Sequence, residues 1–247
     1  MTIHDDPKGI EVKTLLRHVP LKGKEVLEIG CGEGRLTFKY HSIPKRVVAI
    51  DPLSTSIRSA RKRLQENGGR LEFRVGKAED LPFKENSFDV ALFTWSLCCI
   101  DIPAMGRALD EAWRVLRPGG TLANLQPSLF QPFGKGMVSY LIQGQFGTTV
   151  DDDRYRQARL ALKYVSLIEG KFDLLHEEEF SVPTYYDNYA EALADFVLDL
   201  KNEYRTLSRS DKARVKEGIE SLRTPNGIRV IDNVVLTVLS RNGQPAK

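Results

Sequence analysis

The sequence contains little cysteine and no long apolar run. Only three of its 247 residues are cysteine, namely Cys31, Cys98 and Cys99. Two of these are adjacent and the third stands in a glycine-rich turn, so the pattern excludes a disulfide framework. No apolar run of about 18 residues occurs, and the opening MTIHDDPKGIEVK lacks the apolar core of a signal peptide. We therefore expect a cytoplasmic protein without a transmembrane segment.

A large excess of charge of one sign is also absent. The 36 basic and 33 acidic side chains leave a net charge of +3. This excess falls short of the dense basic stripe that is typical of a dedicated nucleic-acid binder. The chain also lacks the GxxxxGK[ST] loop with which many proteins bind nucleoside triphosphates. Composition therefore argues against nucleic acid as a partner.

Strand-like apolar runs alternate with helical stripes in the first half of the chain. Such alternation predicts βα units, which form a parallel sheet with helices on both faces. The N-terminal helix is expected at about Lys8 to His18, and a later one begins after Asp101 and ends before RPGG at Arg117 to Gly120. The expected strands are Glu25 to Ile29, Val47 to Ile50, Leu71 to Val75, Phe88 to Phe93 and Thr121 to Leu125.

The second half of the chain has a different pattern. A stretch rich in aromatic residues and glycine follows Leu125 and has no clear period, which is typical of an insertion or lid. A helix from about Asp153 to Glu169 should follow it. Strands are then expected at Phe172 to Val182 and Ile231 to Ser240, separated by two helices. Asn188 and Ser210 are the expected N-caps of those helices, and the apolar stripe of the first helix extends to Val197 and Leu200.

The segment VLEIGCGEG, from Val26 to Gly34, joins a strand to three glycines at alternate positions. Glycine permits a positive φ and lets the backbone approach a ligand closely, and the amides that open the next helix can face that ligand. Asp51 ends the next expected strand, where its carboxylate can accept both hydroxyls of a ribose. A dinucleotide site would have the spacing GxGxxG, but Arg35 occupies the position of the last glycine. The pattern therefore favours a nucleoside ligand without a pyrophosphate.

Together these motifs resemble the class I S-adenosylmethionine-dependent methyltransferases, in particular the members that methylate small molecules. The resemblance covers about Val12 to Leu125. It implies a Rossmann-like, doubly wound α/β fold with a mostly parallel seven-stranded sheet, an antiparallel last strand and a helical insertion or lid. The matching segments are ExGxGxG at Glu28 to Gly34, Asp51, GKAEDLPF at Gly76 to Phe83, and SFDVALF followed by RVLRPGG between Ser87 and Gly120.

The resemblance also implies roles in binding S-adenosylmethionine and its product S-adenosylhomocysteine. The backbone of the turn would line the methionine and ribose, with Glu28 beneath it to receive the methionine ammonium directly or through water. Asp51 would accept the ribose hydroxyls. No catalytic residue and no metal site is assigned. The expected cofactor-binding residues are Glu28, Gly30, Cys31, Gly32, Gly34 and Asp51, then Pro52 and Leu53 beside the adenine, Ala78 and Glu79 at its edge, and Phe93 and Thr94 near the methionine.

The resemblance further implies a single methyltransferase domain over residues 1–247. Residues 1–125 would form its cofactor-binding half, 126–170 an insertion or lid, and 171–247 a substrate half. Aromatic residues in the later segments suggest a small-molecule acceptor of apolar or aromatic character. These residues are Phe130, Phe133, Tyr140, Phe146, Tyr185 and Tyr186.

Two other functions remain open. An RNA or protein methyltransferase is one, although residues 94–97 read TWSL rather than the NPPY-like tetrad of enzymes that methylate adenine in nucleic acid. A non-catalytic regulatory or partner subunit of the same fold is the other. His176 is a candidate base near the acceptor, but a lone histidine in a strand is more often structural. Cys98 and Cys99 lack a preceding Pro-Cys pair, which favours packed thiols over nucleophiles.

Overall fold

A computed structural model describes residues 3–64, 70–128, 150–197 and 201–243. The expected lid aromatics Phe130, Phe133, Tyr140 and Phe146, and also Leu200, lie outside these residues. The chain forms two compact units. The core unit comprises residues 12–126, 154–178 and 235–247, and the second unit comprises residues 1–11, 127–153 and 179–234.

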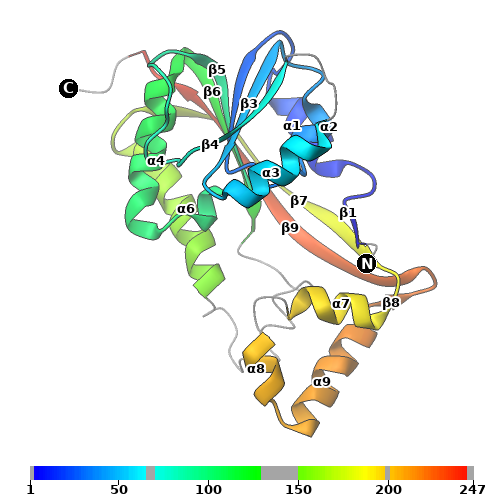
Figure 1. The fold of residues 1–247 in the computed structure, drawn as a ribbon. Helices are drawn as coiled ribbons and strands as arrows, with labels where there is room; N and C mark the ends of the chain where they lie inside the picture. Colours follow the sequence, from blue (N-terminus) through cyan, green and yellow to red (C-terminus); the bar gives the residue numbers. More distant parts are fainter. Residues whose placement is uncertain (1–2, 65–69, 129–149, 198–200, 244–247) are drawn as a thin grey trace. The chain divides into compact units, whose positions relative to one another are not determined.

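The core unit is built on a sheet of order β7-β9-β6-β5-β2-β3-β4. The pairs β2/β3, β3/β4, β2/β5 and β5/β6 are parallel. This confirms the expected doubly wound sheet, whose strand order reverses direction along the chain at β2 (Figure 1). The strands are β2 (Glu25–Ile29), β3 (Arg46–Asp51), β4 (Leu71–Val75), β5 (Phe88–Thr94), β6 (Leu116–Pro127), β7 (Phe172–Tyr186) and β9 (Gly227–Arg241).

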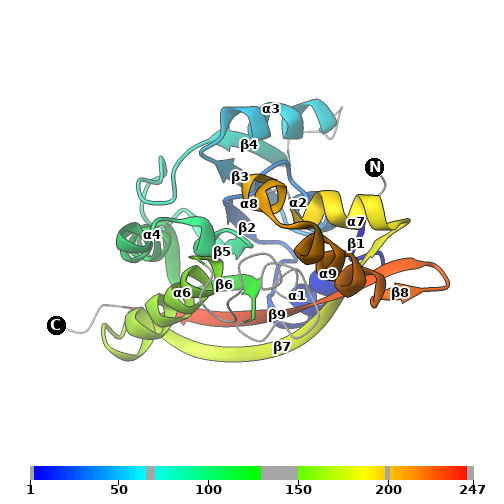
Figure 2. The same cartoon turned by 90° about the horizontal axis from the view of Figure 1, so that it is seen from below.

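Nearly every residue of the central strands is buried, as expected for parallel strands with helices on both faces of the sheet. Leu27, Val48 and Ala91 have no exposed surface. Helices α3 (Ser54–Arg63), α4 (Ile102–Val115) and α6 (Val150–Leu167) flank the strands (Figure 2). Small side chains of α4 and apolar side chains of α6 share one cluster with the strands. Burial of these faces forms the core beneath the strand ends.

The helices around the cofactor half follow the expected pattern with small differences. The N-terminal helix α1 spans Ile10–His18. A four-residue helix, α2 (Thr37–Tyr40), follows the glycine turn, where the sequence analysis expects a helix without giving its bounds. Asp101 occupies the N-cap of α4 but makes no side-chain capping bond. The strand β6 begins directly after α4 and includes the RPGG segment, so the helix ends where the sequence predicts.

Among the described residues, the second unit contains the ends of β7 and β9, two short strands, three complete helices and the first turn of α6. The short strands are β1 (Ile3–Asp5), which pairs with β7, and β8 (Arg223–Thr224), which pairs with β9; neither was expected. Helix α7 (Tyr189–Phe196) ends before the predicted Val197, and an additional helix, α8 (Lys201–Thr206), precedes α9 (Arg209–Glu220). Apolar residues of β7, α7, α9 and β9 form the core of this unit.

The capping residues of α7 and α9 differ in how well the sequence predicts them. The Asn188 side chain accepts a bond from the Glu191 N–H, which confirms the first cap. The second prediction was wrong, because Ser208 rather than Ser210 caps α9. Ser208 has the extended backbone of an N-cap and accepts the N–H of Asp211, whereas Ser210 lies inside the helix.

Within the described residues, no helix has the length and apolar character needed to span a membrane.

Candidate functional site

The glycine turn follows the carboxyl end of β2 and is anchored to β3. Gly30, Gly32 and Gly34 have φ values of 78°, 54° and 81°. Such values are readily adopted by glycine and rarely by other residues. The N–H groups of Gly30 and Cys31 both donate to the Ile50 carbonyl, at 2.8 and 2.9 Å. The turn is therefore held in place by the neighbouring strand.

The three glycines have different surroundings. A Cβ at Gly30 would overlap the Ser96 side chain, and one at Gly34 would lie 2.8 Å from Phe38 Cε2. A Cβ at Gly32 would meet nothing within 4 Å. Gly30 and Gly34 are therefore required for packing, whereas Gly32 leaves space for a ligand to approach the backbone.

Asp51 joins the glycine turn to the end of β3. Its Oδ2 accepts the Gly32 N–H and its Oδ1 accepts the Leu53 N–H, both at 2.9 Å. The residue is 8% exposed. Since each carboxylate oxygen has two acceptor sites, each can still accept a hydroxyl. The arrangement thus fits the two hydroxyls of a ribose beside Gly32.

Glu28 lies beneath the turn and has no exposed surface. Its carboxyl group accepts the hydroxyls of Thr37, Tyr40 and Thr94, each at 2.6 Å. Burial raises the pKa of Glu28 above its usual value, although the three hydroxyl bonds oppose the shift. The side chain therefore supports the turn from below. Its contact with a methionine ammonium stays a prediction.

Apolar side chains lie beside Asp51 at the same edge of the sheet. Leu53 is 61% exposed, and Pro52 is exposed as well. Val75, which the sequence analysis missed, ends β4, pairs with Asp51 and is 51% exposed. Exposed apolar residues around a carboxylate suit a ligand with a flat ring attached to a ribose. The sequence signal that could have identified Val75 is its position as the last residue of an expected strand, as Asp51 comes at the end of its own.

The other expected site residues are less exposed. Ala78 is buried and Glu79 is partly buried, so their backbone groups are the atoms to consider at an adenine edge. The Phe93 side chain belongs to the core and has no exposed surface. Only the backbone of Phe93 could contact a ligand. The Thr94 hydroxyl donates to Glu28, which limits its direct role.

The residues directly after β5 were not identified from the sequence. Ser96 Oγ donates to the Ile29 carbonyl and so braces the end of β2. Trp95 has a φ of 61°, and the Arg35 guanidinium lies 5.6 Å from the centre of its ring. A bulky residue with positive φ costs about 1 to 3 kcal/mol and is common at functional sites. This conformation is not apparent in the letters TWSL.

The burial of Cys31 and Cys98 argues against a nucleophilic role for these two thiols. Cys31 is buried in the turn, where burial and the carboxylates of Glu28 and Asp51 raise the pKa of its thiol. A thiol with a raised pKa remains protonated and unreactive. Cys98 is buried in the core beside β5, which agrees with a packing role, and Cys99 is exposed.

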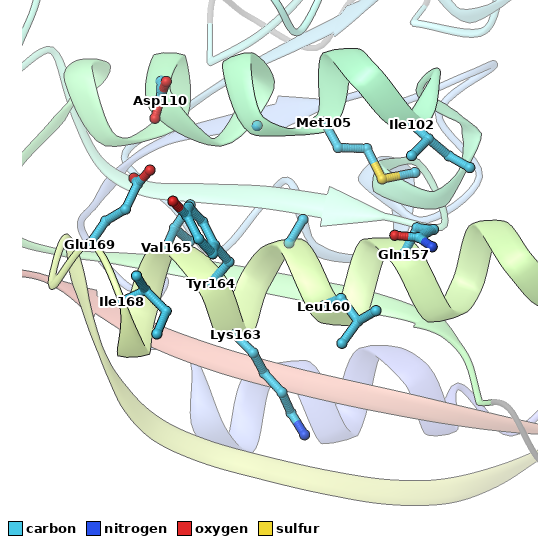
Figure 3. A pocket seen from close by; sticks show the side chains of 12 residues that line it. Ile102, Met105, Asp110, Gln157, Leu160, Lys163, Tyr164, Val165, Ile168 and Glu169 are labelled. Atoms are coloured by element: carbon cyan, nitrogen blue, oxygen red, sulfur yellow. The ribbon is translucent and has the colours of Figure 1, made fainter.

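A separate groove of about 500 Å³ lies between α4 and α6 (Figure 3). Ile102 and Met105 of α4 line it together with Leu160 and Tyr164 of α6 and with Ile168, which directly follows α6. None of the expected cofactor residues lines this groove. The candidate cofactor site is therefore the edge formed by the glycine turn, Asp51 and the end of β4.

Known proteins are similar to this chain in both sequence and fold. A methyltransferase domain family matches residues 26–120. The ubiquinone/menaquinone biosynthesis C-methyltransferase UbiE of Vibrio cholerae is 30% identical over 176 residues, which cover 67% of each protein. The chain belongs to the class I S-adenosylmethionine-dependent methyltransferases. Among these methyltransferases, phthiotriol/phenolphthiotriol dimycocerosates methyltransferase 1 of Mycobacterium ulcerans is 37% identical over 137 residues, 52% of this chain and 48% of that protein.

Solved structures of other methyltransferases have the same fold. The crystal structure of a putative methyltransferase from Bacillus halodurans superposes with a TM-score of 0.60 at 18% identity. The match covers 94% of this chain and 99% of that one. The predicted Rossmann-like fold and methyltransferase class are thus confirmed.

Proposed function

We propose that this methyltransferase binds S-adenosylmethionine at the glycine turn and Asp51 and methylates a lipid-like small molecule. The main support is the joint placement of Gly32 and Asp51. Gly32 leaves open space where a side chain would stand, and Asp51 is held beside it by two N–H donors. This arrangement suits a nucleoside without phosphates. The product would be S-adenosylhomocysteine.

When bound, S-adenosylmethionine supplies a methyl group already activated by a positive sulfur. The protein's task is then mainly to orient the acceptor toward this methyl group and to exclude water. Asp51 would hold the ribose, and Leu53 and Val75 would shield the adenine faces. The backbone of Gly30, Cys31 and Gly32 would line the methionine portion of the cofactor. No side chain is assigned as a base, because the need for one depends on the acceptor atom. A hydroxyl has to lose its proton to a side chain or water near transfer, whereas a neutral amine or an activated carbon needs less help.

The character of the acceptor is inferred from the relatives. One relative is named for ubiquinone and menaquinone biosynthesis, and another for phthiotriol and phenolphthiotriol dimycocerosates. Both names describe apolar small molecules. The proposed acceptor therefore has an apolar body. We include a cytoplasmic location in the proposal, which the absence of a disulfide among Cys31, Cys98 and Cys99 supports.

Replacement of Asp51 tests the cofactor site. Asp51→Ala should weaken S-adenosylmethionine binding by about 1 to 3 kcal/mol, because two charge-assisted hydrogen bonds are lost. Isothermal titration calorimetry measures the effect. Asp173→Ala is a matched control, because Asp173 is an exposed acid on β7. Equal affinity in wild type and Asp51→Ala would refute the assignment of Asp51.

Methyl transfer from a labelled donor tests the acceptor. We expect label in the lipid fraction of a cell extract and none in RNA or protein. Label in RNA or protein would instead support the alternative macromolecular activity. A protein that binds S-adenosylmethionine but transfers no methyl group to any fraction would be a non-catalytic member of the family. Each of these outcomes is separate from the test of cofactor binding.

A further inference from the structure

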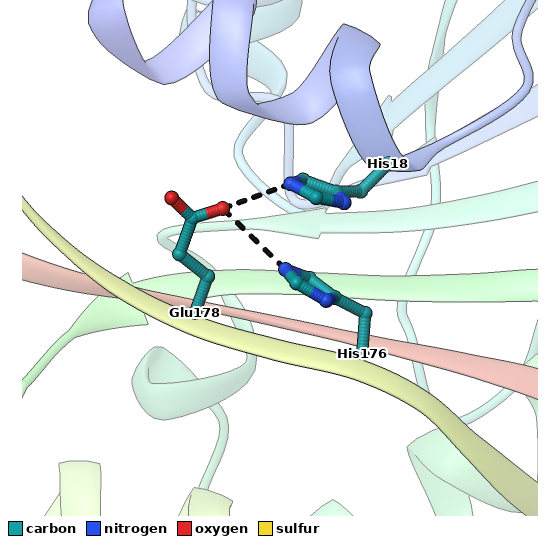
Figure 4. A group of neighbouring side chains, drawn as sticks. All are labelled: His18, His176 and Glu178. Carbon is teal, nitrogen blue, oxygen red and sulfur yellow. Dashed lines mark hydrogen bonds and ion pairs between the residues drawn. The ribbon is translucent and has the colours of Figure 1, made fainter.

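Two histidines and a glutamate meet between the end of α1 and the strand β7 (Figure 4). His18 is the last residue of α1. His176 and Glu178 stand two residues apart on β7, so their side chains point to the same face of the strand. All three belong to the core unit. The cluster is therefore formed within one compact part of the chain.

The distances in this cluster are close to those of a metal site. One ligand atom from each side chain lies within 4.8 Å of the others. Glu178 Oε2 is 2.8 Å from His18 Nε2 and 3.4 Å from His176 Nε2. In a tetrahedral zinc site with bonds of about 2.0 Å, ligand atoms are about 3.3 Å apart. Only small movements are needed to reach that spacing.

The surroundings of His18 provide a second observation that points to a metal site. Its Nε2 is buried and makes no aligned hydrogen bond, although Glu178 is near. The rings of His18 and His176 are stacked, with centroids 3.7 Å apart and planes within 12°. An imidazole nitrogen can offer its lone pair to a metal ion.

We propose that His18, His176 and Glu178 bind a divalent first-row transition ion of the Zn²⁺ type. Two imidazole nitrogens and one carboxylate oxygen are a common ligand set for zinc. The side chains are 21%, 34% and 29% exposed, which leaves room for water at the remaining positions. The rings have to tilt from their parallel stack so that both lone pairs meet, and their partial exposure permits this.

The charges around the cluster allow a cation. Helix α1 ends at His18, and the negative end of a helix dipole favours positive charge. Arg17 binds Glu178 through the other carboxylate oxygen, Oε1, at 3.2 Å. Oε2 therefore remains the oxygen that faces both histidines. Arg17 competes for the carboxylate but does not occupy the cluster.

The proposed ion would fasten α1 to β7. His18 precedes the amino end of β2, whereas the glycine turn follows the carboxyl end of that strand. The metal would thus act on the stability of the core unit and not on the transferred methyl group. Binding of S-adenosylmethionine should be the same with and without the ion.

Titration of tag-free, metal-free protein with Co²⁺ and Zn²⁺ tests the proposal. We expect one ion per chain, visible d–d absorption with Co²⁺ that Zn²⁺ abolishes, and a higher Tm with Zn²⁺. His18→Ala and His176→Ala should each weaken binding by more than about 100-fold, since loss of a direct ligand exceeds the usual effect of outer residues. Their S-adenosylmethionine affinity, which should be unchanged, shows that they are folded.

Two control variants sharpen this test. His41→Ala removes a histidine that packs on Phe38, outside the cluster, and should leave metal uptake unchanged. Arg17→Ala should keep or tighten binding, because Glu178 loses its competing partner. The proposal is overturned if wild-type protein shows no stoichiometric uptake. Uptake that His18→Ala and His176→Ala leave unaltered would overturn it as well.

Discussion

At the residue scale, glycines with positive φ differ in whether packing or ligand binding requires them. Gly23, Gly30 and Gly32 all have positive φ, but a Cβ at Gly30 alone would meet a neighbour, Ser96. The loss of stability on mutation to alanine should therefore be about 1 to 2 kcal/mol at Gly23 and Gly32 from backbone strain. At Gly30 it should be larger by about 1 to 3 kcal/mol because of overlap. Urea unfolding measures all three.

Ligand binding distinguishes Gly32 from Gly23. Gly32→Ala should weaken S-adenosylmethionine binding strongly, because its Cβ enters the space proposed for the ligand. Gly23→Ala should bind normally, since Gly23 lies before β2. Normal binding by Gly32→Ala would show that the ligand does not approach this backbone.

Glu28 makes stability depend on pH. Burial raises its pKa above 4.5 in the folded state, so folding favours the protonated carboxyl group. This contribution to stability is fully present below pH 4.5, the value for the unfolded chain, and is lost as the pH rises through the folded pKa. Glu28→Gln has no such group. Its stability relative to wild type should therefore rise with pH in this window.

Urea unfolding at a series of pH values measures the effect of Glu28. Glu25→Gln is the control, because Glu25 is on the same strand and pairs with Lys45 at the partly exposed surface. Parallel stability curves for wild type and Glu28→Gln would contradict a raised pKa at Glu28.

The sequence predicts the position of some residues of the candidate site and misses others, and their contacts with a cofactor stay a prediction. Gly30, Gly32, Gly34 and Asp51 follow from local spacing, because a turn after a buried strand has few solutions. The side chain of Phe93 faces the core, since register decides which face each residue of β5 takes. His18 and His176 meet only because α1 and β7 are brought together by the fold. Spacing along the chain does not show this contact.

At the scale of single elements, the N-cap of α9 gives a direct test. Ser208→Ala should reduce the stability of the second unit by about 0.5 to 2 kcal/mol, because the Asp211 N–H loses its acceptor. Ser210→Ala should cost less, since Ser210 lies within the helix. Circular dichroism during urea unfolding compares the variants. A larger loss at Ser210 would favour the cap predicted from sequence.

Element type was easier to predict than element ends. The long runs at β2, β3 and β5 are unambiguous, because their residues are buried on both faces. The strand β1 has three residues and α2 has four, too few for a period to appear. The cap of α9 was misplaced by two residues because Ser208 and Ser210 are both suitable caps, and only the backbone conformation distinguishes them.

At the scale of the whole molecule, β7 and β9 each run through both units. The single domain over 1–247, with divisions near residues 125 and 170, stays a prediction. Two boundaries between the units fall within β7 and β9, at 178/179 and 234/235, and the other three fall within α1, β6 and α6. Changes in composition along a chain indicate linkers between domains, but a boundary inside a strand has no linker. This is why sequence patterns did not show it.

The helical segment between β7 and β9 can be tested by excision. Tyr186 and Gly227 lie against each other, so the segment between them leaves and returns at one place. A short glycine-containing linker in place of Asp187 to Asn226 should leave a folded protein that binds S-adenosylmethionine. Methyl transfer to the acceptor should be lost. Calorimetry and the labelled-methyl assay measure the two effects, and loss of both would contradict this separation.

The contact of Tyr186 with Gly227 also bears on how such a protein can change over time. Because the chain returns to its point of departure, the helices α7, α8 and α9 can be lengthened, shortened or exchanged without shifting β7 or β9. The residues proposed to hold the methyl donor do not restrict the length of this segment. On the proposed division into a donor-binding half and a substrate half, selection for a new acceptor can therefore act on residues 187–226 while the donor-binding half stays as it is.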